Sequence, residues 1–443
     1  MGRNSQTHSL GVWMNGERVG TWTTVPNRAQ RFAYAEAWLL SPRRRPLSLS
    51  MPLRPSETAY TGDVVRNFFD NLLPDAPAIR QRIQARFKSA SDEAFDLLAH
   101  IGRDCVGAIQ LLPLDEEPQH ILQVRGRPLS NHDIDVLLDD CLTSGPGHQG
   151  DDEFRISLAG AQEKTALLRT PVGWQLPLGS TPTTHILKLP IGTGNQSIDL
   201  STSVENEWLC SRILEAFEIP VAATEILQFG KHKVLCVARF DRQFSEAGDQ
   251  LFRLPQEDFC QATATPAALK YEADGGPGIE SIMRLLAGSE TAQADRERFV
   301  RTQIIFWLLC AIDGHAKNFS LFLQPEGRYR LTPVYDVLSA YPVLGKGAGM
   351  LSPHKVKMAM AVSGRNKHYK WKEIRPEHWI QTGTQNGLSE ETMHTMLADL
   401  SRRVPQIAQV VRDSLPAEFP TDVAARIFNG ICEAAKQLEV SIS

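Results

Sequence analysis

Three polar residues in the second half of the chain have the types and spacing of a phosphoryl-transfer site. Asp313 follows the apolar run Ile304–Ile312, Asn318 comes five positions later, and Asp336 follows an alternating segment. Protein kinases use this Asp-x₄-Asn interval, because the aspartate accepts or orients the proton of the attacking hydroxyl while the asparagine and a second aspartate hold Mg²⁺. Gly314 permits a tight loop between them. The interval alone also occurs by chance, and a lone aspartate at position 336 is also typical of a helix cap or turn.

An upstream strand and helix offer a partner for the nucleotide. Lys188 lies in the alternating segment "THILKLP", which is typical of the strand that carries an ATP-pairing lysine. The alternative is a solvated lysine on an edge strand. A helix is predicted over Ser203–Phe217, with Ser203 as its N-cap. Either Glu205 or Glu207 could hold the lysine by an ion pair. Glu207 is preferred because it lies one turn inside the helix, and surface carboxylates favoured by the helix dipole are the alternative.

A glycine-containing turn precedes that strand and is a candidate phosphate loop. The segment "SLAGAQEK" lies between two predicted strands, where its main-chain N–H groups could face phosphates. It lacks the spacing of a Walker P-loop, so a plain hairpin turn remains an alternative. Ser157 stands at the start of this loop. A phosphate on its hydroxyl would add a charge of about -1.5 to -2 where ATP has to bind.

The elements that must position these residues suggest three regions. Residues 1–145 are predicted to contain a β-hairpin with a turn at Asn15-Gly16 and helices between 66 and 87, broken near Pro74. Leu142–Glu153 is a polar linker candidate. Residues 146–254 form a β-rich nucleotide-binding lobe with one helix, and residues 255–443 an all-helical lobe that carries the catalytic loop.

Hydrophobic periodicity identifies two helices of the last region. Residues 296–312 are apolar on nearly every side, which predicts a buried central helix. Residues 391–415 have apolar positions at helical spacing, and the two methionines there are interpreted as core residues. The predicted buried face contains Met393, Met396, Leu397, Leu400, Val404, Ile407 and Val411.

Composition indicates an ordinary soluble globular protein. Of 443 residues, 42% are hydrophobic and 22% charged, and the formal net charge is -4, so no global basic field indicates nucleic acid. The start of the sequence has no signal-peptide pattern, and the longest apolar run is too short to cross a bilayer. Seven single cysteines without a C-x-x-C pair predict a reducing cytoplasm and neither a disulfide framework nor a cysteine zinc site.

Several longer motifs are similar to those of a known family. The segments "FRISLAGAQEKTALL", "TPTTHILKLP", "YEADGGPGI", "DGHAKNFSLF" and "YRLTPVYDVLSAYPVLG" resemble the HipA family of serine/threonine kinase toxins from HipBA-type toxin–antitoxin modules. "VVRNFFDNLLPD" and "LLAHIGRDCVGAIQLLP" extend the resemblance over nearly the whole chain. The resemblance implies an atypical two-lobed kinase-like α+β fold, with an N-terminal α/β region, a β-rich lobe and an all-α C-terminal lobe.

The resemblance also assigns roles to residues. It implies that Asp313 is the catalytic base, that Asn318 and Asp336 bind Mg²⁺, and that autophosphorylation of Ser157 ejects the loop and inactivates the kinase. The segment Val237–Phe240 matches the family's adenine-contacting hinge, and Ala238 departs from a glutamate of that hinge motif. Hinge contacts are largely main-chain, so a changed affinity is expected. The implied ATP contacts are Ala159, Gly160, Ala161, Gln162, Glu163, Lys164, Lys188, Ala238, Arg239, Phe240, Gln256, His315, Lys317, Asn318, Tyr335 and Asp336.

Partners follow from the same resemblance. It implies a growth-arresting toxin whose substrate is a translation protein, with glutamyl-tRNA synthetase suspected. It also implies a HipB-type helix-turn-helix antitoxin dimer, operator DNA bound mainly through that complex, and no membrane partner. Two basic stretches, Arg43–Arg45 and Arg365–Arg375, are candidate DNA contacts, with solvated surface as the alternative. The second is preferred because Tyr369 and Trp371 interleave with its cations, namely Lys370, Lys372 and Arg375.

Two other function classes remain open. One is a catalytically silent kinase-like protein that serves as a corepressor with its antitoxin. The other is a kinase for a small molecule or a lipid head group, of which the lipid is disfavoured because no basic membrane-binding helix is evident. The presence of Asp313, Asn318 and Asp336 together favours the active protein kinase.

Overall fold

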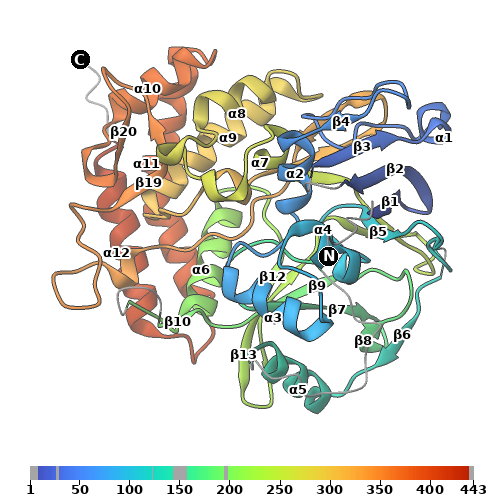
Figure 1. Cartoon of the computed structure of the whole chain (residues 1–443). Coiled ribbons are helices and arrows are strands. Elements are labelled where there is room, and N and C mark those ends of the chain that lie inside the picture. The colour runs from blue at the N-terminus through green and yellow to red at the C-terminus, as the bar shows by residue number, and fades with distance from the viewer. Residues whose placement is uncertain (1–7, 26–28, 122, 143–156, 194–197, 439–443) are drawn as a thin grey trace. The chain divides into compact units, whose positions relative to one another are not determined.

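The computed structural model describes residues 8–25, 29–121, 123–142, 157–193 and 198–438 (Figure 1). It divides into two compact units. The first comprises residues 1–189, 227–268 and 320–329, and the second comprises 190–226, 269–319 and 330–443. The predicted N-terminal region and most of the predicted β-rich lobe therefore share one unit, and the three-part division stays a prediction. None of the described helices combines the length and apolar character needed to span a membrane.

An antiparallel sheet begins the first unit. Its strand order is β4-β3-β2-β1-β5, in which β1 and β2 form the predicted hairpin. Asn15 and Gly16 in the turn of this hairpin both take positive φ, 45° and 83°, as a two-residue hairpin turn requires. Its core includes Trp22, whose ring stacks on Phe69 at 3.9 Å. The strands are β1 (His8–Met14), β2 (Glu17–Thr24), β3 (Gln30–Tyr34), β4 (Tyr60–Thr61) and β5 (Ile109–Pro113). The helices are α1 (Glu36–Leu40), α2 (Asp63–Asp70), α3 (Pro77–Phe87) and α4 (Ala94–Ile101), with the predicted break near Pro74 between α2 and α3.

A second sheet in this unit has the order β12-β13-β9-β7-β8-β6. Helix α5 (Asn131–Leu142) contributes Ile134 and Leu138 to its core cluster. The strands are β6 (Gly126–Pro128), β7 (Lys164–Thr170), β8 (Gly173–Pro177), β9 (His185–Lys188), β12 (Thr224–Phe229) and β13 (His232–Ala238). The predicted linker lies outside the described residues except for Leu142, which ends α5, and so does the start of the predicted strand "FRISL".

Short elements complete the first unit. The hairpin of β14 (Arg242–Phe244) and β15 (Leu251–Arg253) is followed by β16 (Gln256–Asp258), which pairs with β17 (Ser320–Leu323). Helix α7 (Phe259–Ala262) begins with a capping box, in which the Asp258 side chain accepts a hydrogen bond from the Gln261 N–H.

Long helices dominate the second unit. The predicted buried central helix is α9, and the predicted apolar face of α11 is confirmed because all seven of its named residues are buried. Figure 1 shows α11 and α12 side by side, and they are in contact. The helices are α6 (Ser203–Ala216), α8 (Ile279–Leu286), α9 (Ala292–Leu308), α10 (Pro376–Gln385), α11 (Glu390–Asp413) and α12 (Thr421–Lys436).

Two predictions for this part of the chain need correction. Thr202 is the N-cap of α6, so the prediction for Ser203 was wrong by one residue, and the Ser203 hydroxyl instead accepts a hydrogen bond from the Ile191 N–H at 2.9 Å. The stretch from residue 255 onward is mainly rather than entirely helical. Its short apolar segments are too brief for helices and pair as strands, as in β19 (Lys357–Val362) with β20 (His368–Lys370). The remaining short strands are β10 (Gly192–Thr193), β11 (Asp199–Leu200) and β18 (Tyr329–Leu331).

Candidate active site

The loop after α9 brings the predicted aspartate and asparagine together. Cys310 takes a left-handed φ of 48°, which turns the chain after the helix, and Asp313 is exposed. The His315 N–H donates to the Asp313 carbonyl at 2.8 Å, and a 3₁₀ turn, η5 (Ala316–Asn318), ends the loop. Gly314 is required for close approach, because a Cβ there would lie 2.4 Å from the Phe306 ring. The apolar end of α9 therefore sets the position of the loop.

Asn318 connects the loop to the segment that carries Asp336. Its Nδ2 donates to the carbonyl of Asp313 at 2.9 Å and to that of Asp336 at 3.4 Å. With Nδ2 engaged, Oδ1 is the atom of this side chain that can face a cation. Asp336 has a φ of 62°, a backbone conformation that aspartate tolerates better than most residues. An amide oxygen and a carboxylate are the hard oxygen donors that Mg²⁺ prefers, so these residues fit the ion.

Neighbouring residues of the second unit support the loop. His315 and Lys317 are buried, and the Tyr335 hydroxyl donates to the Lys317 carbonyl at 2.9 Å. Tyr335 thus holds the main chain of the loop in place. In α6, Asn206 forms a pair of hydrogen bonds with the Ser339 main chain, at 2.7 and 2.9 Å. These bonds fix the helix against the segment that follows Asp336.

Both glutamates of α6 are buried, at 4% exposure for Glu205 and 2% for Glu207. The surface-carboxylate alternative is therefore wrong for both. Which of them pairs with Lys188 stays a prediction. Lys188 is itself only 6% exposed, and its strand β9 lies between β13 and β7, so the edge-strand alternative is also wrong. A buried lysine inside a sheet has to be compensated by a negative group.

The candidate phosphate loop in the first unit is closed on itself. The Lys164 Nζ donates to the Ala159 carbonyl at 2.6 Å, and Gly160 has a φ of 105° that favours glycine. The Gly160 carbonyl accepts a hydrogen bond from the Asp75 N–H at 3.0 Å. Glu163 pairs with Arg82, and the Gln162 amide donates to the Leu189 carbonyl beyond β9. These contacts hold the loop as an ordered turn before β7.

Ser157 lies at the base of this loop and is 1% exposed. Its Oγ donates to the Leu72 carbonyl at 2.7 Å, and its N–H donates to the Asp104 carbonyl at 3.0 Å. The hydroxyl is therefore inside the protein in this arrangement. A phosphate on Ser157 cannot be accommodated without movement of the loop, because a doubly charged group would replace a buried hydrogen bond.

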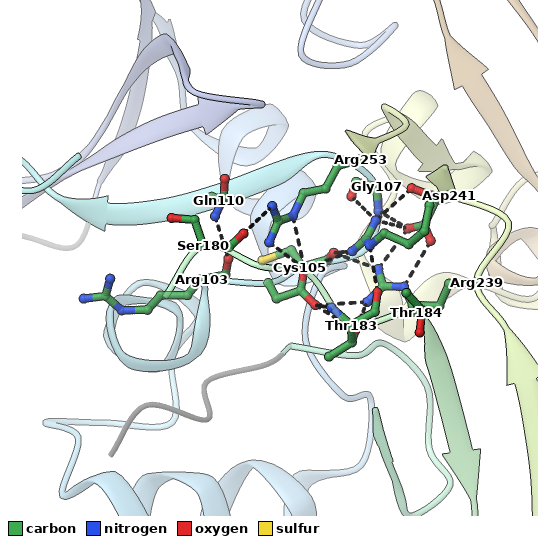
Figure 2. Close-up of polar contacts among 12 residues, drawn as sticks. Arg103, Cys105, Gly107, Gln110, Ser180, Thr183, Thr184, Arg239, Asp241 and Arg253 are labelled. Atoms are coloured by element: carbon green, nitrogen blue, oxygen red, sulfur yellow. Dashed lines mark hydrogen bonds and ion pairs between the residues drawn. The ribbon is translucent and has the colours of Figure 1, made fainter. Parts of the chain in front are cut away.

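The predicted hinge continues into a buried ion network (Figure 2). Arg239 makes a bidentate contact with Asp241, at 3.0 and 2.9 Å. Arg242 contacts both aspartates of the network, Asp104 and Asp241, at 3.0 Å each. Arg253 donates to Asp104 at 3.2 Å. Every one of these side chains is between 2% and 7% exposed, and three cations face two anions.

The arginines decide the charge state of the two aspartates. Burial by itself raises the pKa of Asp104, but Arg242, Arg253 and Arg239 lower it, and the net result is a pKa well below the usual range. The pKa of Asp241 is lowered in the same way, against burial, by Arg239 and Arg242. Burial lowers the pKa of Arg242 to about 10, which still leaves it charged at neutral pH. The network therefore consists of ions.

This network bears on the predicted nucleotide contacts of the hinge. The Arg239 side chain is committed to its aspartates, so a nucleotide contact at this residue would use the main chain. The Gln256 Nε2 donates to Asp241 Oδ2 at 3.2 Å, which ties this second predicted contact to the same network. Phe240 is half-buried, and its ring meets the edge of Phe322 at 5.8 Å. Ala238 ends β13 beside these residues.

Comparison with known proteins identifies the family. A model of the HipA N-terminal domain matches residues 10–112, and a model of the HipA-like C-terminal domain matches residues 156–408. The chain belongs to the HipA family. A relative from Sinorhizobium fredii, "Putative kinase Y4mE", is 31% identical over 440 residues, which are 98% of this chain and 99% of the relative. The "Serine/threonine-protein kinase toxin HipA" of Shewanella oneidensis is 26% identical over 421 residues, 89% of this chain and 90% of that protein.

A solved structure shares the fold. A chain of the Shewanella oneidensis complex of the toxin–antitoxin system HipA, HipB and its operator DNA superposes with a TM-score of 0.79 at 22% identity. The likeness covers 96% of both chains. The predicted α+β, kinase-like fold of the HipA family is thereby confirmed.

The basic stretches of this HipA-family chain differ from their prediction in one respect. Trp371 is buried. Its indole donates to the Trp307 carbonyl at 2.7 Å and the Trp307 indole donates to the Trp371 carbonyl at 3.0 Å, so Trp371 is a core residue and not a surface aromatic. Lys370, Lys372 and Arg375 are exposed, although Lys370 pairs with Glu373 at 2.8 Å. In the first stretch, Arg43 pairs with Glu17 and Arg45 donates to the Leu323 carbonyl. Their DNA contacts stay predictions.

The sequence reasoning missed two features of this HipA-family protein. The ion network joins residues up to 149 positions apart, and no local pattern announces such a meeting. Tyr271, whose hydroxyl donates to the Asp313 carboxylate, was also not predicted. Its segment "YEADGGPGI" was among the family-like motifs of the chain, which is the one signal that marked it.

Proposed function

We propose that this protein is an ATP-dependent serine/threonine kinase and the toxin of a HipBA-type module. The observation that carries the proposal is the arrangement of Asp313, Asn318 and Asp336 in one loop system, where the Asn318 amide donates to the carbonyls of both aspartates. Membership of the HipA family and the kinase names of its relatives support the same reaction.

Each residue of the site has a role in this reaction. Mg²⁺ held by Asn318 and Asp336 would neutralise charge on the β- and γ-phosphates of ATP. Asp313, the exposed carboxylate of the loop, takes the proton of the attacking serine hydroxyl. Lys188 binds phosphate oxygens from β9, and the loop from Ala159 to Lys164 covers the phosphates with its N–H groups. The main chain of the hinge at Ala238 and Phe240 receives the adenine.

Self-inactivation through Ser157 is part of the proposal. The Ser157 hydroxyl is buried and donates to the Leu72 carbonyl, and the Ser157 N–H donates to the Asp104 carbonyl, so phosphorylation requires the loop to leave its place. The phosphorylated loop cannot return, since it would bury a dianion. The phosphate-binding N–H groups then stay away from ATP, and the kinase is switched off.

The proposed partners come from the family. The solved relative is part of a complex with HipB and operator DNA, which supports a HipB-type antitoxin dimer and a corepressor role for this chain. The proposed substrate is a serine of a translation protein, and glutamyl-tRNA synthetase is the first to test. Lys370, Lys372 and Arg375 are exposed and remain the candidate contacts to DNA.

A phosphate-transfer assay tests the proposal. The protein is first treated with a phosphatase, then incubated with Mg²⁺ and γ-labelled ATP, and the labelled peptide is mapped. We expect label on Ser157 in the wild type and a loss of about 10²- to 10⁴-fold in Asp313→Ala. Asp413→Ala, which removes an exposed carboxylate from the end of α11, is the matched control and should label normally.

The alternatives give different results in the same assay. A protein that binds ATP but incorporates no label would be a silent corepressor. Equal labelling of wild type and Asp313→Ala would show that another group is the base. Label that persists undiminished in Ser157→Ala would place self-modification on a different residue.

A further inference from the structure

A tyrosine outside the catalytic loop contacts the proposed base. The Tyr271 hydroxyl donates a hydrogen bond to Asp313 Oδ1. Asp313 is exposed, so packing does not restrict its rotamer. A general base has to be oriented to within a fraction of an ångström and a few tens of degrees of its reacting geometry. A single hydrogen bond to one carboxylate oxygen supplies that orientation.

The main chain around Tyr271 is itself held in place. Its carbonyl accepts hydrogen bonds from the Asp274 and Gly276 N–H groups, at 3.1 and 3.0 Å, in the turn η4 (Glu272–Asp274). Glu272 of that turn accepts a hydrogen bond from the Ala361 N–H at 2.7 Å. The segment is therefore tied to β19 of the same unit.

The ring is aligned by the catalytic loop. It meets the His315 ring edge-to-face, with centroids 5.1 Å apart and an interplanar angle of 82°. The neighbouring Lys270 carbonyl accepts a hydrogen bond from the Ala316 N–H at 3.3 Å. Tyr271 thus contacts the same short loop by its hydroxyl and its ring, and its segment contacts it by the main chain. Because these contacts already fix the ring, the hydroxyl is in position to hold the Asp313 carboxylate before the reaction begins.

We propose that Tyr271 is a positioning residue for phosphoryl transfer, which fixes the Asp313 carboxylate through Oδ1 so that Oδ2 receives the proton of the attacking hydroxyl. This inference rests on the proposed kinase function. In the reaction, the serine oxygen forms a bond to the γ-phosphorus, the bond to the β–γ bridging oxygen breaks, and ADP leaves. The serine proton passes to Oδ2, while Tyr271 keeps its own proton.

The hydrogen bond between Tyr271 and Asp313 should affect the reaction rate more than the stability of the fold. A hydrogen bond between two partly solvated groups contributes little to folding, because water replaces either partner when it is lost. The same bond has a large effect on rate when it removes rotational freedom from a catalytic group. Loss of the phenol hydroxyl is therefore expected to lower the rate constant and to leave the folded state and the ATP affinity unchanged.

The test compares Tyr271→Phe with the wild type and with Tyr329→Phe. Tyr329 is also a half-buried tyrosine and is not among the predicted site residues, so its variant controls for loss of a hydroxyl. The maximal rate of label incorporation and the ATP concentration at half-maximal rate are measured with γ-labelled ATP. We expect Tyr271→Phe to lower the maximal rate about 10- to 100-fold with an unchanged half-maximal ATP concentration. Tyr329→Phe should match the wild type.

A double variant separates positioning from general damage. If Tyr271 acts through Asp313, adding Tyr271→Phe to Asp313→Ala should cost nothing further. A full additional loss in that background, or a wild-type rate in the single variant, overturns the inference while the kinase function stands. A wild-type protein that transfers no phosphate overturns the kinase function itself, and the inference with it. Equal thermal midpoints of Tyr271→Phe and wild type exclude misfolding as the cause.

Discussion

Two groups of acidic residues in this protein have opposite environments. In the first unit, Asp104 and Asp241 are buried and paired with three arginines of the same chain. In the second unit, Asp313 is exposed and Asp336 is half-buried. The Asn318 amide donates to the main-chain carbonyls of both, and the Tyr271 hydroxyl donates to the Asp313 carboxylate. The carboxylates of the first group form ion pairs with buried arginines, while the hydrogen bonds described for the second group position its two aspartates within the catalytic loop system.

This difference separates a structural from a functional use of the same side chain. A buried carboxylate with its own cations has no capacity left for a ligand, and removing it leaves unpaired buried charge. A carboxylate outside such a network can bind a metal ion or accept a proton. We therefore expect changes in the first group to alter stability and changes in the second to alter activity.

The largest effect is expected for Asp104→Ala. It leaves three buried arginines with a single carboxylate and removes the acceptor of the Thr183 N–H and hydroxyl. The free energy of unfolding should fall by about 3–5 kcal/mol, measured by urea denaturation. Asp115→Ala, at an exposed site in the same unit, is the control and should change it by less than about 0.5 kcal/mol. Unchanged stability of Asp104→Ala would contradict the structural interpretation of the network.

The opposite pattern is expected for Asp336→Asn. Asparagine tolerates the left-handed backbone at this position, so the variant tests the carboxylate and not the backbone. Phosphate transfer with Mg²⁺ should fall about 100-fold because one hard anionic ligand is lost, while the urea midpoint stays that of the wild type. A wild-type rate would show that the metal site is misplaced.

A smaller, pH-dependent effect on stability is expected for Glu257, another buried acid of the first unit that can be compared with Asp104. Glu257 is fully buried like Asp104, and its Oε1 accepts a hydrogen bond from the Leu49 N–H at 2.8 Å. Burial raises its pKa to about 8, against the smaller lowering effects of hydrogen bonds from Ser48 and from the Leu49 N–H. A folded-state pKa above the unfolded value means that its contribution to stability is present below about pH 4.5 and is lost as the pH rises through about 8.

Glu257→Gln should remove this dependence. The wild-type free energy of unfolding should decline relative to the variant between about pH 5 and 8, by at most about 1.4 kcal/mol for each pH unit. Thermal unfolding at several pH values measures it. Parallel curves for the two proteins would show that Glu257 keeps an ordinary titration in the folded state.

Local patterns predicted much of the fold. The Asn15-Gly16 turn and the buried face of α11 depend on periodicity and on turn residues, which act over a few positions. The capping of α6 was misplaced by one residue, because Ser203 and Thr202 are equivalent cap residues and the choice depends on a contact with Ile191. Trp371 was assigned to the surface because a run of cations surrounds it in sequence, whereas the core around Trp307 encloses it.

The catalytic loop could be recognised from the sequence because its residues are close along the chain and share one interval. Asp313 and Asn318 lie on one short loop after a buried helix, and the loop geometry follows from that spacing. The environment of each side chain could not be obtained this way. Whether Lys188 was on an edge or inside a sheet, and whether Glu205 and Glu207 were exposed, depended on strand order and helix packing.

By itself, then, the sequence determined the family, the residues of the proposed phosphoryl-transfer site and the local turns, since these depend on neighbours in the chain. The tertiary structure alone decided which charges are compensated. Asp104 meets Arg239, Arg242 and Arg253 only after the chain has folded, and Tyr271 reaches Asp313 across 42 positions. Such pairings depend on distances in space, and no interval along the chain encodes them. Burial makes them decisive, because an unpaired ion costs far more free energy inside the protein than in water.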